Sequence, residues 1–147
     1  MTEQFTTKDN GDRAKLEGGM VRDTEEGKTR WDLIPDPVFF FYYGANVTTK
    51  IINAYHDKDW TLFLSELIRL ECQGDAVVFW KRQADLMERG SLKYGAENWK
   101  LGKGKDAHER YRKSLNRHFK QWLMGDREED HAVACAFNIN GLLYTEE

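Results

Sequence analysis

Residues able to bind and cleave a phosphate compound are concentrated in the C-terminal half of the sequence. The stretch from Ser91 to His131 combines lysine, arginine, histidine, aromatic residues and a run of carboxylates. Cations bind phosphate oxygens, aromatic rings stack on bases, and clustered carboxylates hold Mg²⁺. The composition of this stretch therefore indicates a site for a phosphate-bearing nucleotide. The candidate residues are Lys93, Tyr94, Asn98, Trp99, Arg117, His118, Asp126, Glu129, Asp130, His131 and, further along, Asn138.

Carboxylates in the segment GDREEDH suggest a metal site. Asp126, Glu129 and Asp130 would face the same side of a helix, and carboxylates this close repel each other unless a cation neutralises them. Such an oxygen cage suits Mg²⁺ or Mn²⁺. Asp85 and Glu88 could supply a second carboxylate pair, or could be two solvated charges. No pair of histidine or cysteine residues has the spacing of a zinc site.

A basic stripe runs along the helix expected over residues 106–124. Arg110, Lys113, Arg117 and Lys120 recur at intervals of three and four residues. The stripe could be a solvated face, or Arg117, which is nearest the apolar edge, could clamp phosphate. His118 lies on the apolar face, where a core histidine is the simpler interpretation.

Lys93, Tyr94, Asn98 and Trp99 fall in a glycine- and lysine-rich segment, residues 91–105, that reads as a loop. The order GxxxxGK[ST] of a P-loop is absent. The segment could be a flap that contacts phosphate or a plain surface loop.

We predict that the elements that position these residues are all helices. Apolar residues recur at helical spacing over residues 62–72 and 75–89, with Gly90 as the expected end, and again over 106–124 and after Asp126. The helix from Val38 is apolar nearly all round and should be buried. Small residues in the last helix imply a close neighbouring helix. We predict an all-α domain over residues 28–147, preceded by a mostly disordered polar arm, residues 1–27.

Bulk properties exclude several classes of protein. The 147-residue chain has a formal net charge of −3, so nucleic-acid binding is not expected. The longest apolar run, residues 38–43, is too short to cross a bilayer. Cys72 and Cys135 fit reduced core residues of a cytoplasmic protein.

Four segments, in order, resemble one known family. They are KTRWDLIP at 28–35, GSLKYGAENW at 90–99, Arg117-His118 with Trp122, and Gly125-Asp126 followed by EDHA at 129–132 and Asn138. The sequence resembles the phage dATP/dGTP diphosphohydrolases of the MazZ type, which are related to the MazG-like all-α nucleoside triphosphate pyrophosphohydrolases. It departs from them in about forty additional residues, 38–75, which we interpret as an inserted helical segment. Ala134 replaces a second histidine, and Asp126 stands where glutamate is usual.

The resemblance implies a helical bundle that hydrolyses purine deoxynucleoside triphosphates with Mg²⁺ (or Mn²⁺), adjusting the phage nucleotide pool in the host cytoplasm. By that analogy the catalytic residues are Lys93, Arg117, His118 and His131, and relatives that assemble as dimers or tetramers suggest a homo-oligomer. Tyr94 or Trp99 would stack on the base, and Asn98 or Asn138 would read its edge. His131 would orient water or bind metal.

A different class of function remains open from the sequence. A non-catalytic helical module that binds a nucleotide or a protein partner would also explain the loose acidic motifs and the replaced histidine.

Overall fold

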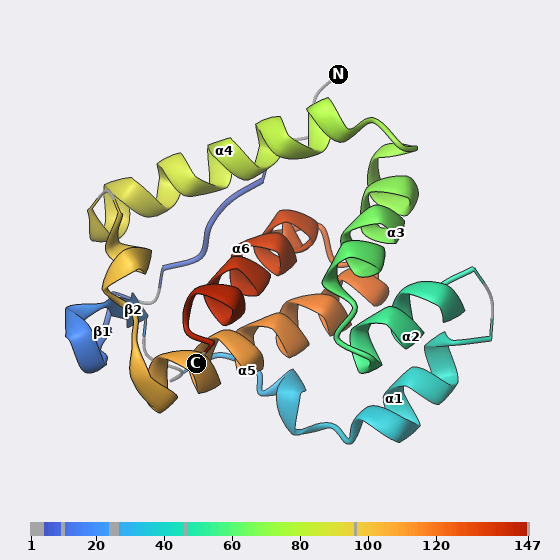
Figure 1. The fold of residues 1–147 in the computed structure, drawn as a ribbon, viewed down its shortest axis with the longest axis horizontal. Helices are drawn as coiled ribbons and strands as arrows, with labels where there is room; N and C mark the ends of the chain where they lie inside the picture. The colour runs from blue at the N-terminus through green and yellow to red at the C-terminus, as the bar shows by residue number, and fades with distance from the viewer. Residues whose placement is uncertain (1–4, 10, 24–26, 46, 96, 147) are drawn as a thin grey trace.

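The structure is a computed structural model that describes residues 5–9, 11–23, 27–45, 47–95 and 97–146. Within these residues the chain is predominantly α-helical, and its one sheet is a two-stranded antiparallel hairpin near the N-terminus (Figure 1). The predicted all-α class is confirmed. No helix in the described ranges is both long and apolar enough to cross a membrane.

Helices α5 (Gly104–Leu123) and α6 (His131–Tyr144) form the centre of the molecule (Figure 1). Ten of the fourteen α6 residues are buried, so this helix is interior and needs no polar face. The two helices approach closely at Gly141, where a Cβ atom would lie 2.2 Å from the Tyr111 ring. The close neighbour implied by the small residues of the last helix is therefore α5. Cys135 is buried in this interface as a free thiol.

Helices α3 (Trp60–Cys72) and α4 (Ala76–Tyr94) cover α6, and each begins at an aspartate. The side chains of Asp59 and Asp75 accept hydrogen bonds from the backbone N–H of Leu62 and Val78, each at 3.2 Å. The expected end of α4 at Gly90 is wrong. The helix continues through it to Tyr94, and Gly95, which follows, has a φ of +92°, a value that glycine adopts without the steric cost of a side chain. Lys93 and Tyr94 therefore lie on the last helical turn and not in a loop.

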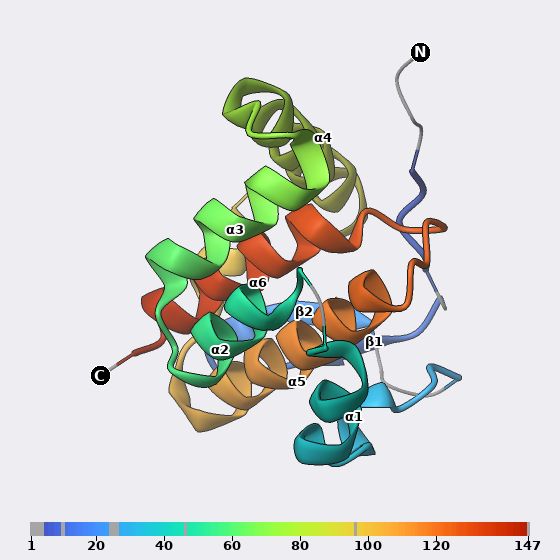
Figure 2. The same cartoon turned by 90° about the vertical axis from the view of Figure 1, so that its right-hand side faces the viewer.

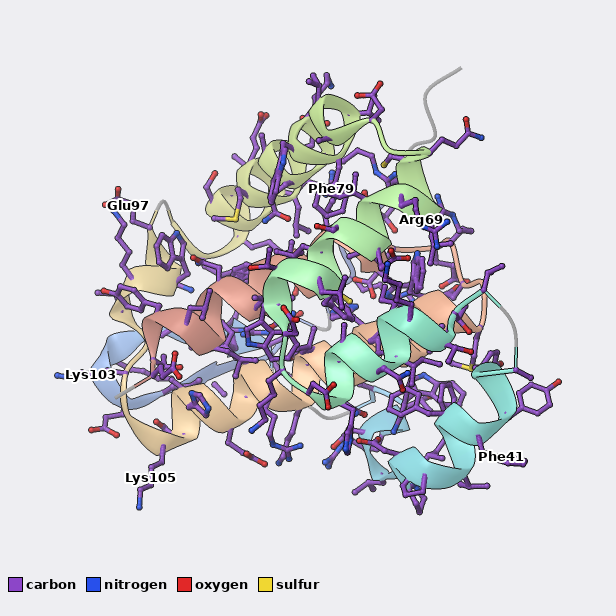
Figure 3. The ribbon with its side chains drawn as sticks, turned by 45° about the vertical axis from the view of Figure 1, so that its right-hand side comes forward. Phe41, Arg69, Phe79, Glu97, Lys103 and Lys105 are labelled. Atoms are coloured by element: carbon purple, nitrogen blue, oxygen red, sulfur yellow. The ribbon has the colours of Figure 1, made fainter. Side chains whose placement is uncertain are left out.

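Helices α1 (Asp36–Tyr43) and α2 (Thr49–His56) lie at one side of the bundle (Figures 1 and 2). The expectation that the α1 helix is buried all round is wrong. Phe39 is buried, but Phe41 and Tyr42 are 86% and 75% exposed, and Figure 3 shows Phe41 pointing away from the bundle. The helix is at the edge of the molecule, so only one of its faces meets the core.

Lys120 of α5 fixes the segment that leads into α1. Its ammonium group is fully buried and donates to the carbonyl oxygens of Trp31 (3.1 Å) and Ile34 (2.7 Å), and it lies 3.0 Å from the Asp36 carboxylate. A lysine ammonium has three donors, and these partners satisfy all of them. The basic stripe is therefore not a uniformly solvated face, and the short 3-10 helix η2 (Trp31–Leu33) docks on it.

The arm differs from the expected disordered segment. Strands β1 (Arg13–Lys15) and β2 (Val21–Asp23) form the hairpin, joined through the 3-10 turn η1 (Glu17–Gly19). Met20 is fully buried in the main core, which anchors the hairpin to the helices. A lone methionine among polar residues has no periodicity, and this is why the pattern predicted no structure here.

Residues 38–75, interpreted as an insertion, form most of α1 together with α2 and α3. Ile51, Phe63 and Leu67 from this segment are fully buried in the common core. The segment is thus part of the domain, and its absence from relatives stays a prediction.

Candidate active site

A cavity of about 590 Å³ lies between the N-terminal arm, α4, α5 and α6. In Figure 1 the chain of residues 5–9 runs between α4 and α6, along one side of this space. Most of the predicted site residues line the cavity, although they come from separate elements. The lining includes Lys93, Tyr94, Asn98, Trp99, Arg117, His118, Glu129, Asp130 and Asn138. Asp85, Glu88, Asp126 and His131 are not part of the lining.

Three cations from three parts of the chain line the same cavity: Arg22 of β2, Lys28, and Arg117 of α5. Arg22 Nη2 donates to Ser114 Oγ at 3.2 Å, but Nη1 is buried without a hydrogen-bond partner in the described part of the chain. Desolvation and the neighbouring Arg117 lower the pKa of Lys28 to about 8. Desolvation and the charge of Arg110 lower the pKa of Arg22 to about 10. Desolvated cations that repel each other are stabilised by a bound anion, so this wall suits phosphate.

Lys93 and Tyr94 meet the carboxylate of Asp23, which is 3% exposed. Tyr94 Oη donates to Asp23 at 2.7 Å and Lys93 Nζ lies 3.1 Å from it; Lys93 also donates to the carbonyl oxygen of Lys8 at 2.9 Å. Asp23 also accepts from Arg13 at 2.8 Å. Both α4 side chains thus hold the hairpin and arm in place. The phosphate role of Lys93 and the stacking role of Tyr94 stay predictions.

Asn98 and Trp99 begin the 3-10 helix η3 (Asn98–Leu101). The Asn98 amide pairs at both ends with the Val21 backbone, accepting from N–H at 3.0 Å and donating to the carbonyl at 2.9 Å. This pairing occupies the amide oxygen and nitrogen that would otherwise form hydrogen bonds with a base. The Trp99 ring packs edge-on against Tyr144, with ring centroids 5.2 Å apart, and lines the cavity. Trp99 is thus the better placed of the two stacking candidates.

His118 and His131 form a hydrogen-bonded pair between α5 and α6. Their Nδ1 atoms lie 2.8 Å apart, and His131 Nε2 lies 2.5 Å from Asp126 Oδ2. The His131 contact holds the pKa of Asp126 below its usual range. Desolvation and the charge of Arg117 hold the pKa of His118 well below its usual range, so its imidazole is neutral at pH 7. One oxygen of Glu129 lies with the two histidines in a cluster whose ligand atoms are within 4.8 Å of one another.

The predicted carboxylate cage does not form. Residues 125–130 are a loop, and α6 begins only at His131, so the helical spacing assumed for Asp126, Glu129 and Asp130 does not apply. Asp130 caps α6 and is 3% exposed. It forms a bidentate pair with Arg82, with N–O distances of 2.6 Å and 2.8 Å. Its carboxylate is therefore used structurally. Asp85 lies 3.3 Å from Lys81 on the outside of α4, and Glu88 is exposed, so they do not face the loop carboxylates as a second pair.

Asn138 is 2% exposed and lines the cavity. Its Nδ2 donates to the carbonyl oxygen of Ala134 at 2.8 Å, one helical turn back. Its Oδ1 is buried and accepts no hydrogen bond in the described residues. An unpaired buried acceptor is costly unless a ligand supplies a donor, so Asn138 is better suited than Asn98 to read a base.

Sequence reasoning missed the contribution of the arm. Arg22 and Asp23 fall in a segment without periodicity, and nothing in their local pattern indicates a site. Lys28 opens the segment KTRWDLIP, and this motif is the sequence signal that points to it. Arg82 was missed because its partner, Asp130, is 48 residues away.

The fold and site together define a class: an all-α protein with a cavity that combines a cationic wall, aromatic rings and a histidine–carboxylate cluster. Residues 77–147, just under half of the chain, match the family model described as dATP/dGTP diphosphohydrolase, N-terminal, and this match supports the resemblance to that family. Three of the four recognised segments lie within the match, whereas KTRWDLIP lies before it. Neither a curated protein nor a solved structure matches the chain.

Proposed function

We propose that the chain hydrolyses a purine deoxynucleoside triphosphate, dATP or dGTP, to the monophosphate and pyrophosphate in the cavity between the arm, α4, α5 and α6. The observation that carries this proposal is the cationic wall of Arg22, Lys28 and Arg117. Its charges are desolvated and mutually repelling, and a triphosphate would neutralise them. The match to a dATP/dGTP diphosphohydrolase family supports the reaction and the purine class.

The substrate would lie with its phosphates against this wall and its base toward α6. Arg22 would use its unpartnered Nη1 on a phosphate oxygen, and Arg117 would stabilise the charge that develops during cleavage. The base would reach Trp99 for stacking and Asn138 Oδ1 for a hydrogen bond. Cleavage between the α- and β-phosphates transfers the α-phosphoryl group to water and releases pyrophosphate.

The water must lose a proton, and the neutral His118 imidazole is the nearest candidate acceptor on this wall. Behind it, His131 and Asp126 continue the hydrogen-bonded chain, so the three residues can hold and orient the proton. This assigns catalytic roles to His118 and His131, as the resemblance implies.

Mg²⁺ fits this structure poorly as a resident ion. Asp126, Glu129 and Asp130 do not converge, and Mg²⁺ requires a near-octahedral set of oxygen ligands. We propose instead that Mg²⁺, or Mn²⁺, enters as the nucleotide complex, since Mg²⁺ is commonly held by substrate phosphates and one carboxylate. Glu129, the one member of the three carboxylates that lies in the histidine cluster, would be that carboxylate.

Incubation of the purified protein with each deoxynucleoside triphosphate and Mg²⁺ or Mn²⁺, with products separated by anion exchange, tests the reaction. We expect monophosphate and pyrophosphate from a purine substrate and at least about a tenfold loss of rate in Arg22→Gln and Arg117→Gln. Release of inorganic triphosphate, with its three phosphates still joined, would contradict cleavage between the α- and β-phosphates. Tight binding of a non-hydrolysable triphosphate without turnover of any substrate would favour the alternative, a nucleotide-binding module.

We also propose that the protein is a homo-oligomer that acts where nucleotides are made, in the cytoplasm. The homo-oligomer is supported by the exposed apolar surface at the α1 edge, which we call the α1 face. It consists of Leu33, Val38, Phe41, Tyr42 and Val47, each more than 60% exposed. Large contiguous apolar surfaces on soluble proteins commonly mark association sites.

A further inference from the structure

We propose that His118, His131 and Glu129 form a binding site for a divalent transition-metal ion of the zinc, cobalt and nickel class, with Asp126 as its outer hydrogen-bond partner. The proposal stands on the geometry of these side chains and does not depend on the proposed hydrolysis, whose roles for His118, His131 and Glu129 apply to the protein without this ion. It also differs from the all-carboxylate Mg²⁺ cage expected from the sequence.

Two imidazole nitrogens from different helices already face each other at this site. His118 Nδ1 and His131 Nδ1 are 2.8 Å apart, which requires one shared proton between them. Tetrahedral zinc with nitrogen ligands at about 2.0–2.1 Å places two such nitrogens about 3.3 Å apart. A metal ion could therefore replace the shared proton, which would move to Nε2 of His118, after the rings separate by roughly half an ångström.

Asp126 sets the correct tautomer of His131 for metal binding. The carboxylate accepts the Nε2–H of His131 at 2.5 Å, which leaves Nδ1, the nitrogen that faces His118, for the metal ion. A carboxylate behind a ligating histidine is the usual outer shell of transition-metal sites. His131 is also 2% exposed, so its orientation is fixed by packing.

Glu129 completes a set of two nitrogens and one oxygen. Its Oε2 accepts the backbone N–H of Lys8 at 3.1 Å, which holds the carboxylate at the cavity edge, and a carboxylate has lone pairs for a second contact. Imidazole ligands favour zinc-class ions, whereas Mg²⁺ prefers oxygen ligands alone. Three protein ligands would leave a fourth position open to water from the cavity.

Direct metal titration without nucleotide tests this site, using tag-free protein purified in the presence of a chelator and then freed of it. We expect Zn²⁺ to bind with one-to-one stoichiometry by calorimetry, and Co²⁺ to give the intense visible absorption of a four-coordinate site. A large excess of Mg²⁺ should displace neither ion. Asp126→Asn should weaken Zn²⁺ binding about 10–100-fold, and Glu129→Gln and His118→Gln by at least as much.

Two variants control for binding elsewhere on the protein. Glu128→Gln removes the neighbouring exposed carboxylate, and His56→Ala removes an exposed histidine of α2; both should bind metal as the wild type does. Absence of Zn²⁺ binding at millimolar concentration would overturn the proposal. So would Zn²⁺ affinity that is unchanged in both Glu129→Gln and His118→Gln, or displacement of Zn²⁺ by Mg²⁺. Loss of nucleotide hydrolysis alone would not bear on this result, because the titration contains no substrate.

Discussion

Lys28 carries a positive charge in a place where the fold makes that charge unfavourable. Its pKa of about 8 results from desolvation and from the charges of Arg117 and Arg22. A bound triphosphate would stabilise the protonated form and raise this pKa. Affinity should therefore be greatest below about pH 8 and fall as the pH rises through 8, by up to about tenfold per pH unit. Calorimetric titration with a non-hydrolysable triphosphate between about pH 7 and pH 10 measures this dependence.

A permanently charged side chain provides the control for Lys28. An arginine holds its proton to a higher pH than a lysine in the same surroundings, so Lys28→Arg should bind the triphosphate with a much flatter pH profile around pH 8. An equally steep decline in the wild type and in Lys28→Arg would mean that another group titrates.

Asn138 lines the cavity, and its Oδ1 is buried without a hydrogen-bond donor among the described residues. We expect Asn138→Ala to weaken binding of dATP by about 1–3 kcal/mol, because the exocyclic amino group of the base would lose its partner. The comparison ligand is the purine triphosphate that lacks this amino group, measured by the same calorimetric titration. The substitution should cost little affinity for that ligand, whereas an equal loss for both ligands would indicate a structural role for Asn138.

At the scale of elements, the close contact between α5 and α6 depends on the absence of a side chain at Gly141. Gly141→Ala would place a methyl group 2.2 Å from the Tyr111 ring. Overpacking of this kind typically costs about 1–3 kcal/mol, so the free energy of unfolding in urea should fall by that amount. The matched control is Gly90→Ala within α4, where a Cβ would meet nothing within 4 Å. This second change should stabilise the protein by about 0.5–1 kcal/mol, and a destabilisation would contradict a continuous α4 helix.

Asp130 links α6 to α4 through its ion pair with Arg82, so we expect it to contribute to stability more than to metal binding. Its side chain is 2% exposed and its Arg82 partner 14%. Removal of one partner from a buried pair costs about 3–5 kcal/mol, and Arg82 retains Glu71, so Asp130→Ala should cost about 3 kcal/mol in urea denaturation. The solvated pair of Asp85 and Lys81 is the comparison, and Asp85→Ala should change stability by less than about 0.5 kcal/mol. Similar values for the two variants would refute the structural role.

At the scale of the whole molecule, the rest of the described chain leaves the α1 face exposed. We expect the wild type to scatter light as a species heavier than the 17.2 kDa monomer. Phe41→Glu places a charge on a side chain that is 86% exposed, so it should dissociate the assembly while leaving the circular dichroism spectrum of the helices unchanged. An unchanged mass in the variant would exclude this face as the interface.

Local patterns predicted most of the helical fold. Asp59 and Asp75 cap helices close to where the periodic apolar residues begin, and capping is a short-range interaction that sequence reveals. Local sequence predicts the ends of helices and the burial of side chains less well. Gly90 and Gly95 are both plausible terminators, and only packing decides between them. The aromatic run at 39–43 predicts a helix, but its exposure depends on neighbours that local sequence does not specify.

The sequence by itself determined the helical class, the resemblance of the C-terminal part to one family and nine of the residues that line the cavity, because motif order and periodicity are local properties. Only the tertiary structure decided which of these residues act together. It brought Arg22 from the arm, and Lys28 from the segment that follows it, to the cavity that Arg117 lines. It also brought His118 of α5 to His131 of α6, and Asp130 to Arg82. The physical reason is that hydrogen bonds and charge interactions act over a few ångströms in space. Such contacts link positions 13 to 95 residues apart, and nothing in the sequence between them marks the pairing.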